Sequence, residues 1–238
     1  MEKLKDKHVL VVGASGGIGE QTVKQLTQSG AIVYATSRDL NRLETFTSKY
    51  GLPVPRQFEM DITSSQNIHD IANKIHLNIP AIDILVNAAG IGIIKPFEQL
   101  TDADFRKSID VNLIGAFNLL QAFLPAMKVQ KKGLIINIPG VLGKTPMAGA
   151  AAYAASKYGL NGMMKSLREE LKRTDIRITQ LFLGGVDSTF WDTIDLRVQR
   201  DKMILAEEAA KAIWFLCQQP ISGVVSEMVI QPFNHQVI

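Results

Sequence analysis

The chain of 238 residues is long enough for one large domain with a hydrophobic core, and its 46% hydrophobic and 21% charged residues exclude a mostly disordered protein. A formal net charge of +3, without long basic clusters, gives no indication of nucleic-acid binding. The single cysteine, Cys217, excludes an internal disulfide and a cysteine-rich zinc site, and the four histidines are too scattered to predict a metal site.

Short β-branched segments alternate along the chain with longer segments of helical periodicity. The predicted strands are residues 9–12, 32–35, 55–60, 82–86, 134–138, 176–182 and 224–230. The predicted helices are residues 18–28, 40–49, 64–76, 102–127, 150–173 and 206–218. Several strands are apolar throughout, which is typical of strands buried on both faces of a parallel sheet. The alternation predicts an α/β fold in one domain, residues 1–238, with a doubly wound parallel sheet of about seven strands and helices on both faces.

Several helix boundaries carry signals of their own. Asp39 is placed to cap the helix that begins at residue 40, and Thr101 with Asp104 forms a capping-box pattern. Gly51 follows the end of the second predicted helix, where glycine is the favoured residue.

Two further stretches bear on location and function. The longest uncharged stretch, residues 111–127, is shorter than the roughly 20 apolar residues of a membrane span, and no apolar leader precedes the first strand. We therefore expect a soluble cytoplasmic protein without a membrane partner. The irregular residues 184–203 interrupt the regular pattern, which predicts a substrate lid around residues 186–204.

A glycine-rich turn joins the first strand to the first helix, with the sequence Gly13-Ala14-Ser15-Gly16-Gly17-Ile18-Gly19. Glycines permit a tight turn and bring backbone N–H groups, at the positive end of the helix dipole, against a phosphate. Such a turn alone can be a plain strand–helix corner. Its place at the start of a strand–helix–strand pattern predicts a dinucleotide site.

The end of the second strand indicates which dinucleotide binds. A carboxylate about 20 residues past the glycines would bind a ribose 2′-hydroxyl, whereas an arginine accommodates a 2′-phosphate. Ser37 occupies the position expected for the acid and Arg38 follows it, while Asp39 is explained by helix capping. We therefore predict NADP rather than NAD, with Arg38 beside the 2′-phosphate.

A series of motifs resembles those of the short-chain dehydrogenase/reductase family over essentially the whole chain. They are the glycine spacing of the turn, Asp61-Ile62, Asn87-Ala88-Ala89-Gly90, Asn112, Tyr153-Ala-Ala-Ser-Lys157 and Gly185-Val186-Asp187-Ser188. The resemblance implies a Rossmann-like fold and an oxidoreductase that interconverts a carbonyl compound and its secondary alcohol by hydride transfer. The implied cofactor-binding residues are Gly13, Ser15, Gly16, Gly17, Ile18, Gly19, Ser37, Arg38, Asp61, Ile62, Asn87, Ala88, Gly90, Tyr153, Lys157, Gly185, Val186 and Ser188.

The resemblance also implies a catalytic set of Tyr153, Lys157 and Asn112. Tyr153 and Lys157 are four residues apart and therefore share one face of a helix. A tyrosine at its ordinary pKa of about 10 is a poor base at neutral pH, and we expect the lysine ammonium to lower the pKa of Tyr153. In the family mechanism Tyr153 exchanges the proton of the carbonyl or alcohol. Lys157 also holds the nicotinamide ribose, and Asn112 orders a water linked to Lys157.

The catalytic serine of the family has no counterpart here. Gly140, in Asn137-Ile138-Pro139-Gly140, occupies its position, thirteen residues before Tyr153. Loss of one preorganised donor to a developing oxyanion lowers a rate by about 10²–10³. One hypothesis is a working NADP-dependent oxidoreductase with a reduced catalytic set, which the three remaining residues favour. The other is a catalytically impaired relative that binds NADP(H) as a scaffold or sensor.

The substrate region is predicted at residues 91–97, 141–147 and 189–203. Its apolar side chains indicate a small or medium carbonyl or alcohol with an apolar body; they are Ile93, Ile94, Met147, Phe190 and Trp191. Residues 226–232 resemble the family branch that acts on serine and 3-hydroxy acids. Lys144, Arg197 and Arg200 are the candidate carboxylate partners.

The resemblance also implies that the protein forms oligomers. Family members commonly form dimers or tetramers through helices that match residues 102–127 and 150–173, together with the last strand. We therefore expect a homodimer or homotetramer. Cys217 lies in an apolar helical segment and is expected to be a buried packing residue.

Overall fold

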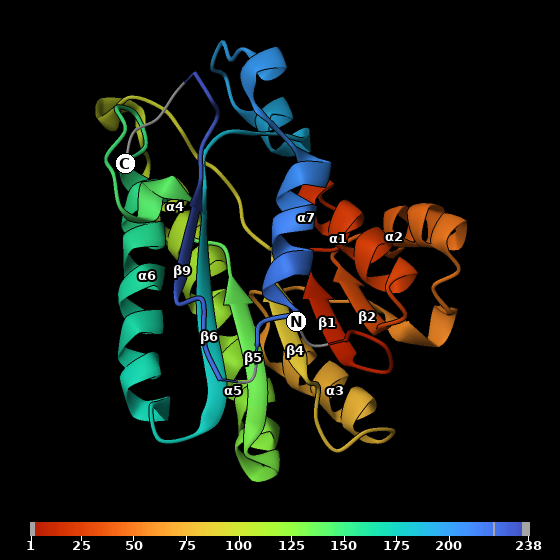
Figure 1. Ribbon diagram of the computed structural model, residues 1–238. Coiled ribbons are helices and arrows are strands. Elements are labelled where there is room, and N and C mark those ends of the chain that lie inside the picture. Colours follow the sequence, from red (N-terminus) through yellow and green to blue (C-terminus); the bar gives the residue numbers. More distant parts are fainter. Residues whose placement is uncertain (1–2, 221, 235–238) are drawn as a thin grey trace.

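The fold is built on a seven-stranded parallel sheet with the strand order β3-β2-β1-β4-β5-β6-β9 (Figure 1). The computed structural model describes residues 3–220 and 222–234. The strands are β1 (His8–Val12), β2 (Ile32–Ser37), β3 (Gln57–Glu59), β4 (Ile84–Asn87), β5 (Lys132–Asn137), β6 (Asp175–Leu183) and β9 (Glu227–Ile230). The strand order reverses between β1 and β4, so a crevice opens beyond their carboxyl ends, where ligands bind in folds of this type.

Helices cover both faces of the sheet. They are α1 (Gly17–Gln28), α2 (Leu40–Thr47), α3 (Ser65–His76), α4 (Asp102–Ile109), α5 (Gly115–Gln130), α6 (Ala151–Leu171) and α7 (Ala206–Leu216). One buried cluster joins α1, α2 and α7 to the sheet, and a second joins α3, α5 and α6 to the opposite face. The predicted doubly wound α/β fold, with a parallel sheet of about seven strands, is therefore confirmed.

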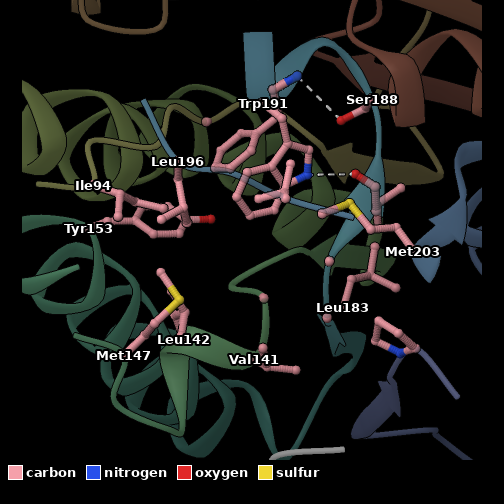
Figure 2. A pocket seen from close by; sticks show the side chains of 18 of the residues that line it. Ile94, Val141, Leu142, Met147, Tyr153, Leu183, Ser188, Trp191, Leu196 and Met203 are labelled. Atoms are coloured by element: carbon pink, nitrogen blue, oxygen red, sulfur yellow. Dashed lines mark hydrogen bonds between the residues drawn. The ribbon is translucent and has the colours of Figure 1, made fainter. Parts of the chain in front are cut away.

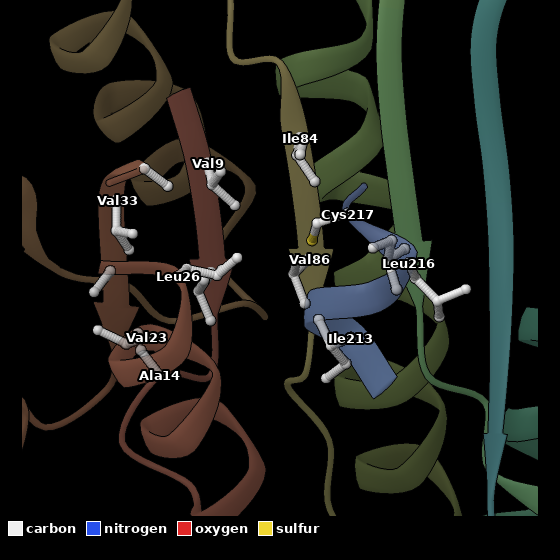
Figure 3. Close-up of a cluster of buried hydrophobic side chains, with 14 of the residues drawn as sticks. Val9, Ala14, Val23, Leu26, Val33, Ile84, Val86, Ile213, Leu216 and Cys217 are labelled. Carbon is white, nitrogen blue, oxygen red and sulfur yellow. The ribbon is translucent and has the colours of Figure 1, made fainter. Parts of the chain in front are cut away.

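The cluster beneath α1 and α7 shows why the strands are apolar (Figure 3). Leu26 of α1 and Ile213 of α7 pack toward Val9 and Val86 of the sheet, and all four are fully buried. Full burial of such a side chain stabilises a fold by about 1.5–3 kcal/mol. Cys217 lies in the same cluster, and burial raises the pKa of its thiol, so it is a packing residue as predicted.

The predicted helix caps are confirmed. The Asp39 carboxylate accepts a 2.9 Å hydrogen bond from the Arg42 N–H at the start of α2. Thr101 and Asp104 form the reciprocal capping box, at 3.1 and 3.0 Å. Gly51 has φ +70°, a left-handed conformation that glycine adopts without strain.

The predicted helix over residues 102–127 is in fact two helices. A π-helical turn, Asp110–Ile114, separates α4 from α5. Single turns of this kind are frequently found at functional sites, and this one carries Asn112. By length and composition alone the whole stretch Asp102–Gln130 could cross a membrane. Core helices of globular proteins pass the same test, and Leu119 and Phe123 are buried in the second cluster.

Other segments also differ from their predictions, and the strand predicted at residues 224–230 begins only at Glu227. The strand predicted at residues 55–60 is only Gln57–Glu59, because Val54–Arg56 forms a 3₁₀ turn around a proline. The irregular residues before α7 contain a small two-stranded sheet of β7 (Val186–Asp187) and β8 (Ile204–Leu205). This sheet joins the two ends of the predicted lid. Strands of two residues carry no periodicity by which they could be predicted.

Candidate active site

The glycine-rich turn forms a close-fitting cradle at the carboxyl end of β1. Gly13 has φ +79°, and a Cβ there would lie 2.8 Å from the Ala89 backbone. A Cβ on Gly19 would lie 2.2 Å from the Gly13 carbonyl oxygen. No side chain caps α1, whose N-cap is Gly16, so first-turn N–H groups are available to a ligand. These features fit a bound pyrophosphate.

The end of β2 forms the side of the site predicted to bind adenosine. The Ser15 and Ser37 hydroxyls are 2.6 Å apart, and Ser37 also accepts a hydrogen bond from the Asp39 N–H. Arg38 is exposed beside them. Hydrogen bonds from the Thr63 N–H and hydroxyl lower the pKa of Asp61, and the charge of Arg38 adds to this effect.

Ile62, also predicted as a cofactor residue, has its side chain elsewhere. It is buried against Gly115 of α5, where an added Cβ would lie 2.8 Å from its Cγ1 atom. The side chain therefore packs in the core and does not reach the crevice.

The motif after β4 is held in place by two buried amides. Asn87 Nδ2 donates a hydrogen bond to Asn137 Oδ1 at 3.1 Å, and Asn87 Oδ1 accepts one from the Ala89 N–H at 3.3 Å. Gly90 lies between two members of the predicted catalytic set, since a Cβ there would be 3.1 Å from Asn112 Oδ1 and 3.2 Å from Lys157 Nζ. A side chain at position 90 would push these two residues apart.

Asn112 uses its side chain to connect three segments. Its Oδ1 atom accepts from the Ile91 N–H, and its Nδ2 atom donates to the Ile91 carbonyl and the Ser156 hydroxyl, each at 2.9 Å. The side chain is thus occupied by protein partners. The predicted role of ordering a water would have to be taken by backbone groups of the π-helical turn.

Tyr153 and Lys157 lie on one face of α6, as their spacing predicts. Lys157 Nζ donates to the Ile138 carbonyl at 3.1 Å and lies 5.6 Å from the centre of the Tyr153 ring. Burial lowers the pKa of Lys157 to about 8 and raises the pKa of Tyr153. The expectation that Lys157 lowers the pKa of Tyr153 is therefore wrong for the chain alone, because the loss of water around the phenol dominates.

Gly140 faces the phenol. It has φ +70° and ψ 169°, and a Cβ built on it would lie 3.9 Å from the Tyr153 hydroxyl oxygen. The position is thus close enough for a side chain to contact whatever Tyr153 contacts.

A cavity of about 800 Å³ is lined by Gly140, Tyr153 and Lys157 (Figure 2). It runs from Ile18 and the 88–90 loop past Tyr153 and Lys157 to the predicted lid. Most of its other lining side chains are apolar: Ile94, Val141, Leu142, Met147, Leu183, Phe190, Trp191, Leu196 and Met203. Four of the five apolar residues named from the sequence line it, and Ile93 does not. Pro232 and Asn234 also line the cavity; Pro232 ends the segment 226–232 that was singled out only for its resemblance to a family branch, and Asn234 was not predicted.

The segment from residue 186 to 204 covers Tyr153. The Phe190 ring lies 5.8 Å from the Tyr153 ring and 5.2 Å from the Trp191 ring. It also fills the space above Gly92, where a Cβ would lie 2.2 Å from Phe190 Cζ. The Trp191 indole N–H donates to the Val186 carbonyl at 3.0 Å (Figure 2).

Three cationic side chains were predicted to bind a substrate carboxylate, and two of them form ion pairs within the protein. Lys144 pairs with Glu227 and lies 4.2 Å from the centre of the Phe182 ring. Arg200 pairs with Asp187 at 3.7 Å and with Asp192. Arg197 is the member of this set that lines the cavity. Over residues 3–220 and 222–234, no group of three or more His, Cys, Asp or Glu side chains could hold a metal ion.

The fold and the site together define a class of protein. A doubly wound parallel sheet, a glycine cradle at its switch point and a buried tyrosine–lysine pair beside that cradle are features of a nicotinamide-dependent oxidoreductase. The family model for short chain dehydrogenases matches residues 7–198. The chain belongs to this family and is an NAD(P)-dependent oxidoreductase of the short-chain type.

Individual relatives agree over nearly the whole chain. An uncharacterized oxidoreductase of Staphylococcus epidermidis is 33% identical over 232 residues, which cover 98% of this chain and 100% of that protein. The crystal structure of a metagenomic short-chain oxidoreductase in complex with NADP is 32% identical, with a TM-score of 0.83 over 97% of this chain and 99% of that one. Serine dehydrogenase from Escherichia coli is 27% identical, with a TM-score of 0.83 over 97% and 100%.

Proposed function

We propose that the chain interconverts a small or medium carbonyl compound and its secondary alcohol, with NADP(H) as the cofactor. Tyr153, Lys157 and Asn112 form the catalytic set, and Gly140 takes the position of the family serine. The observation that carries the proposal is one cavity that is lined by Tyr153 and Lys157, by Ile18 of the glycine-rich turn and the 88–90 loop, and by the apolar side chains of the predicted substrate region.

The reduced cofactor, when bound, would supply the hydride. Residues from both halves of the chain would hold the cofactor. The turn from Gly13 to Gly19 would bind the pyrophosphate. Arg38 would bind the 2′-phosphate, because its side chain is exposed and the neighbouring Ser37 carries no negative charge that would repel a phosphate. Asp61 would bind the adenine, Lys157 would hold the nicotinamide ribose, and residues 87–90 and 185–188 would contact the nicotinamide. The NADP bound to the metagenomic relative supports the choice of NADP over NAD.

Tyr153 moves the proton. Because burial raises its pKa, the phenol stays protonated at neutral pH and is ready to donate to a carbonyl oxygen. Lys157, with a pKa of about 8, is cationic at pH 7 and stabilises the negative charge that forms when the phenol gives up its proton. Gly140 adds no hydroxyl, so the substrate oxygen receives one side-chain donor fewer than in the family pattern.

The lid of residues 186–204 and the apolar walls select a substrate with an apolar body. A 3-hydroxy or 3-oxo acid is the favoured class, and the similarity to serine dehydrogenase, whose name states a 3-hydroxy amino acid substrate, supports it. The cytoplasmic location and the homodimer or homotetramer remain predictions.

The experiment is an assay of NADPH consumption with a panel of aldehydes, ketones and oxo acids. We expect Tyr153→Phe to lower kcat/KM by about 10²-fold or more, because it removes the proton donor and keeps the ring. Tyr50→Phe, in the turn after α2 and outside the cavity, is the matched control. Tight NADPH binding without turnover, or equal rates in Tyr153→Phe and wild type, would contradict the proposal.

A further inference from the structure

The charges that line the cavity all have one sign. Its charged lining residues are Lys157, Arg197 and Lys202, and among the described residues of the lining there is no Asp or Glu. Lys157 is buried at the catalytic end, whereas Arg197 and Lys202 are exposed and belong to the lid. The solvent side of the cavity is therefore cationic.

The two lid cations have no acidic partner in the described part of the chain. The lid acids that form ion pairs, Asp187 and Asp192, both pair with Arg200. Asp195 and Asp201 are exposed and do not line the cavity. Arg200 is thus neutralised within the lid, while its neighbours Arg197 and Lys202 are available to an external anion.

Most other side chains that line the cavity are apolar. Leu142, Met147 and Leu196 are among them, and their side chains offer neither hydrogen bonds nor charge (Figure 2). A ligand that matches the whole cavity has a carbonyl group at Tyr153, an apolar body and an anionic group at the lid. An uncharged ketone would match only the first two parts.

We propose that Arg197 and Lys202 bind an anionic group of the substrate, so that the enzyme acts on acidic carbonyl compounds and their alcohols. This inference rests on the proposed function and assigns the residues that bind the acidic group of its substrate. Arginine binds carboxylate and phosphate oxygens equally well through its planar fork, and lysine adds a point charge. The anion is therefore the carboxylate of an oxo acid or the phosphate of a nucleotide-bearing thioester.

The experiment compares anionic substrates with neutral ones of the same shape. The oxo acids are 3-oxobutanoate, 4-oxopentanoate and 5-oxohexanoate, each measured beside its methyl ester, and 3-oxobutanoyl-coenzyme A is the phosphate-bearing probe. The proteins are wild type, Arg197→Met, Lys202→Met and the control Arg173→Met, whose cation is exposed near the end of α6 and outside the cavity.

We expect wild type to prefer at least one anionic substrate over the matched ester by tenfold or more in kcat/KM. Arg197→Met should remove most of that preference by raising KM, with kcat and the ester kinetics unchanged, as for a residue that binds substrate and transition state equally. Lys202→Met should act in the same direction, and Arg173→Met should have no effect. Which anion loses its advantage distinguishes the carboxylate from the phosphate.

A binding measurement keeps the inference testable without turnover. Trp191 lines the cavity, so tryptophan fluorescence reports ligand binding, and Arg197→Met should weaken binding of the acid by tenfold or more but not that of the ester. The Kd of NADPH should stay the same, which would exclude a role for Arg197 in holding the cofactor phosphates. Equal use and equal binding of acids and esters by wild type would overturn the inference while leaving the oxidoreductase activity intact.

Discussion

Gly140 adopts a backbone conformation that other residues avoid. With φ +70° and ψ 169° it lies in a region populated almost solely by glycine, and a non-glycine residue there is strained by about 1–3 kcal/mol. We therefore expect Gly140→Ser to lower the free energy of unfolding by about that amount, measured by chemical denaturation. The hydroxyl would be introduced together with a distortion of the loop, so we expect no gain in kcat.

Gly140→Ala is the control for this variant. It has the same strain and no hydroxyl, so the difference between the serine and alanine variants isolates the contribution of the hydroxyl group. A Gly140→Ser protein as stable as wild type would contradict the assigned conformation. A serine variant much faster than both others would show that the missing hydroxyl limits the rate.

In the protein without bound cofactor, Lys157 makes the free energy of unfolding depend on pH. Its pKa falls from 10.5 to about 8 on burial, so between pH 8 and 10.5 the unfolded chain binds more protons than the native chain. The free energy of unfolding contributed by this residue should therefore rise with pH over that range, by up to about 3 kcal/mol. The raised pKa of Tyr153 opposes the rise only above pH 10, where an unfolded tyrosine ionises.

The measurement is denaturant unfolding of wild type and Lys157→Met between pH 7 and 9.5. Wild type should gain stability relative to the variant as pH increases above 8. If the difference in the free energy of unfolding between the two proteins is independent of pH, the Lys157 amine is not buried in a way that lowers its pKa.

Phe190, in the predicted lid, packs directly over Gly92. A methyl group at position 92 would overlap the Phe190 ring, so Gly92→Ala should displace the ring from Tyr153. We expect a loss of about tenfold or more in kcat/KM, because misplacement near a reacting centre lowers rates steeply. The variant should also change the emission of Trp191, whose ring contacts Phe190.

A double-mutant cycle tests this contact. In a Phe190→Ala background the alanine at position 92 has no ring to displace, so its effect should largely disappear. Equal effects of Gly92→Ala in both backgrounds would show that the glycine acts through some other neighbour.

The elements that sequence could predict are those with long periodic patterns or side-chain caps. All strands of the main sheet were predicted, as were the capping residues Asp39 and Thr101, because burial and local hydrogen bonding determine them. The π-helical turn around Asn112 was not, since one inserted residue leaves the apolar pattern nearly unchanged. The short strands β7 and β8 depend on each other across 18 residues of lid and leave no local signal.

Parts of the site depend on tertiary neighbours and for that reason could not be predicted. Lys144 and Arg197 were equivalent candidates from the sequence, and only the position of Glu227, distant in the chain, distinguishes them. The raised pKa of Tyr153 likewise follows from burial by several segments, which the four-residue spacing to Lys157 does not encode.

The two halves of the chain contribute unequally to the two sides of the predicted site. The glycine turn, the end of β2 and the 88–90 loop come from the first half and form the predicted cofactor side. α6, the lid and the chain after β9 come from the second half and form most of the substrate side. The reversal of strand order between β1 and β4 brings the two sets together at one edge of the sheet.

The helices predicted to form the subunit interface expose large apolar side chains. Phe105 of α4, Phe117 of α5 and Tyr158 of α6 are 42%, 45% and 44% exposed. Exposed large apolar side chains on these helices are what a surface that associates with a second copy would present. We expect size-exclusion chromatography with light scattering to show that the wild-type protein is a dimer or tetramer. Phe117→Glu should shift the protein toward monomer, because the substitution would bury a charge in the interface. Leu77→Glu, at an apolar residue that is 84% exposed just after α3, should leave the assembly unchanged. A monomeric wild type, or a Phe117→Glu protein with the mass of the wild-type assembly, would contradict this interface.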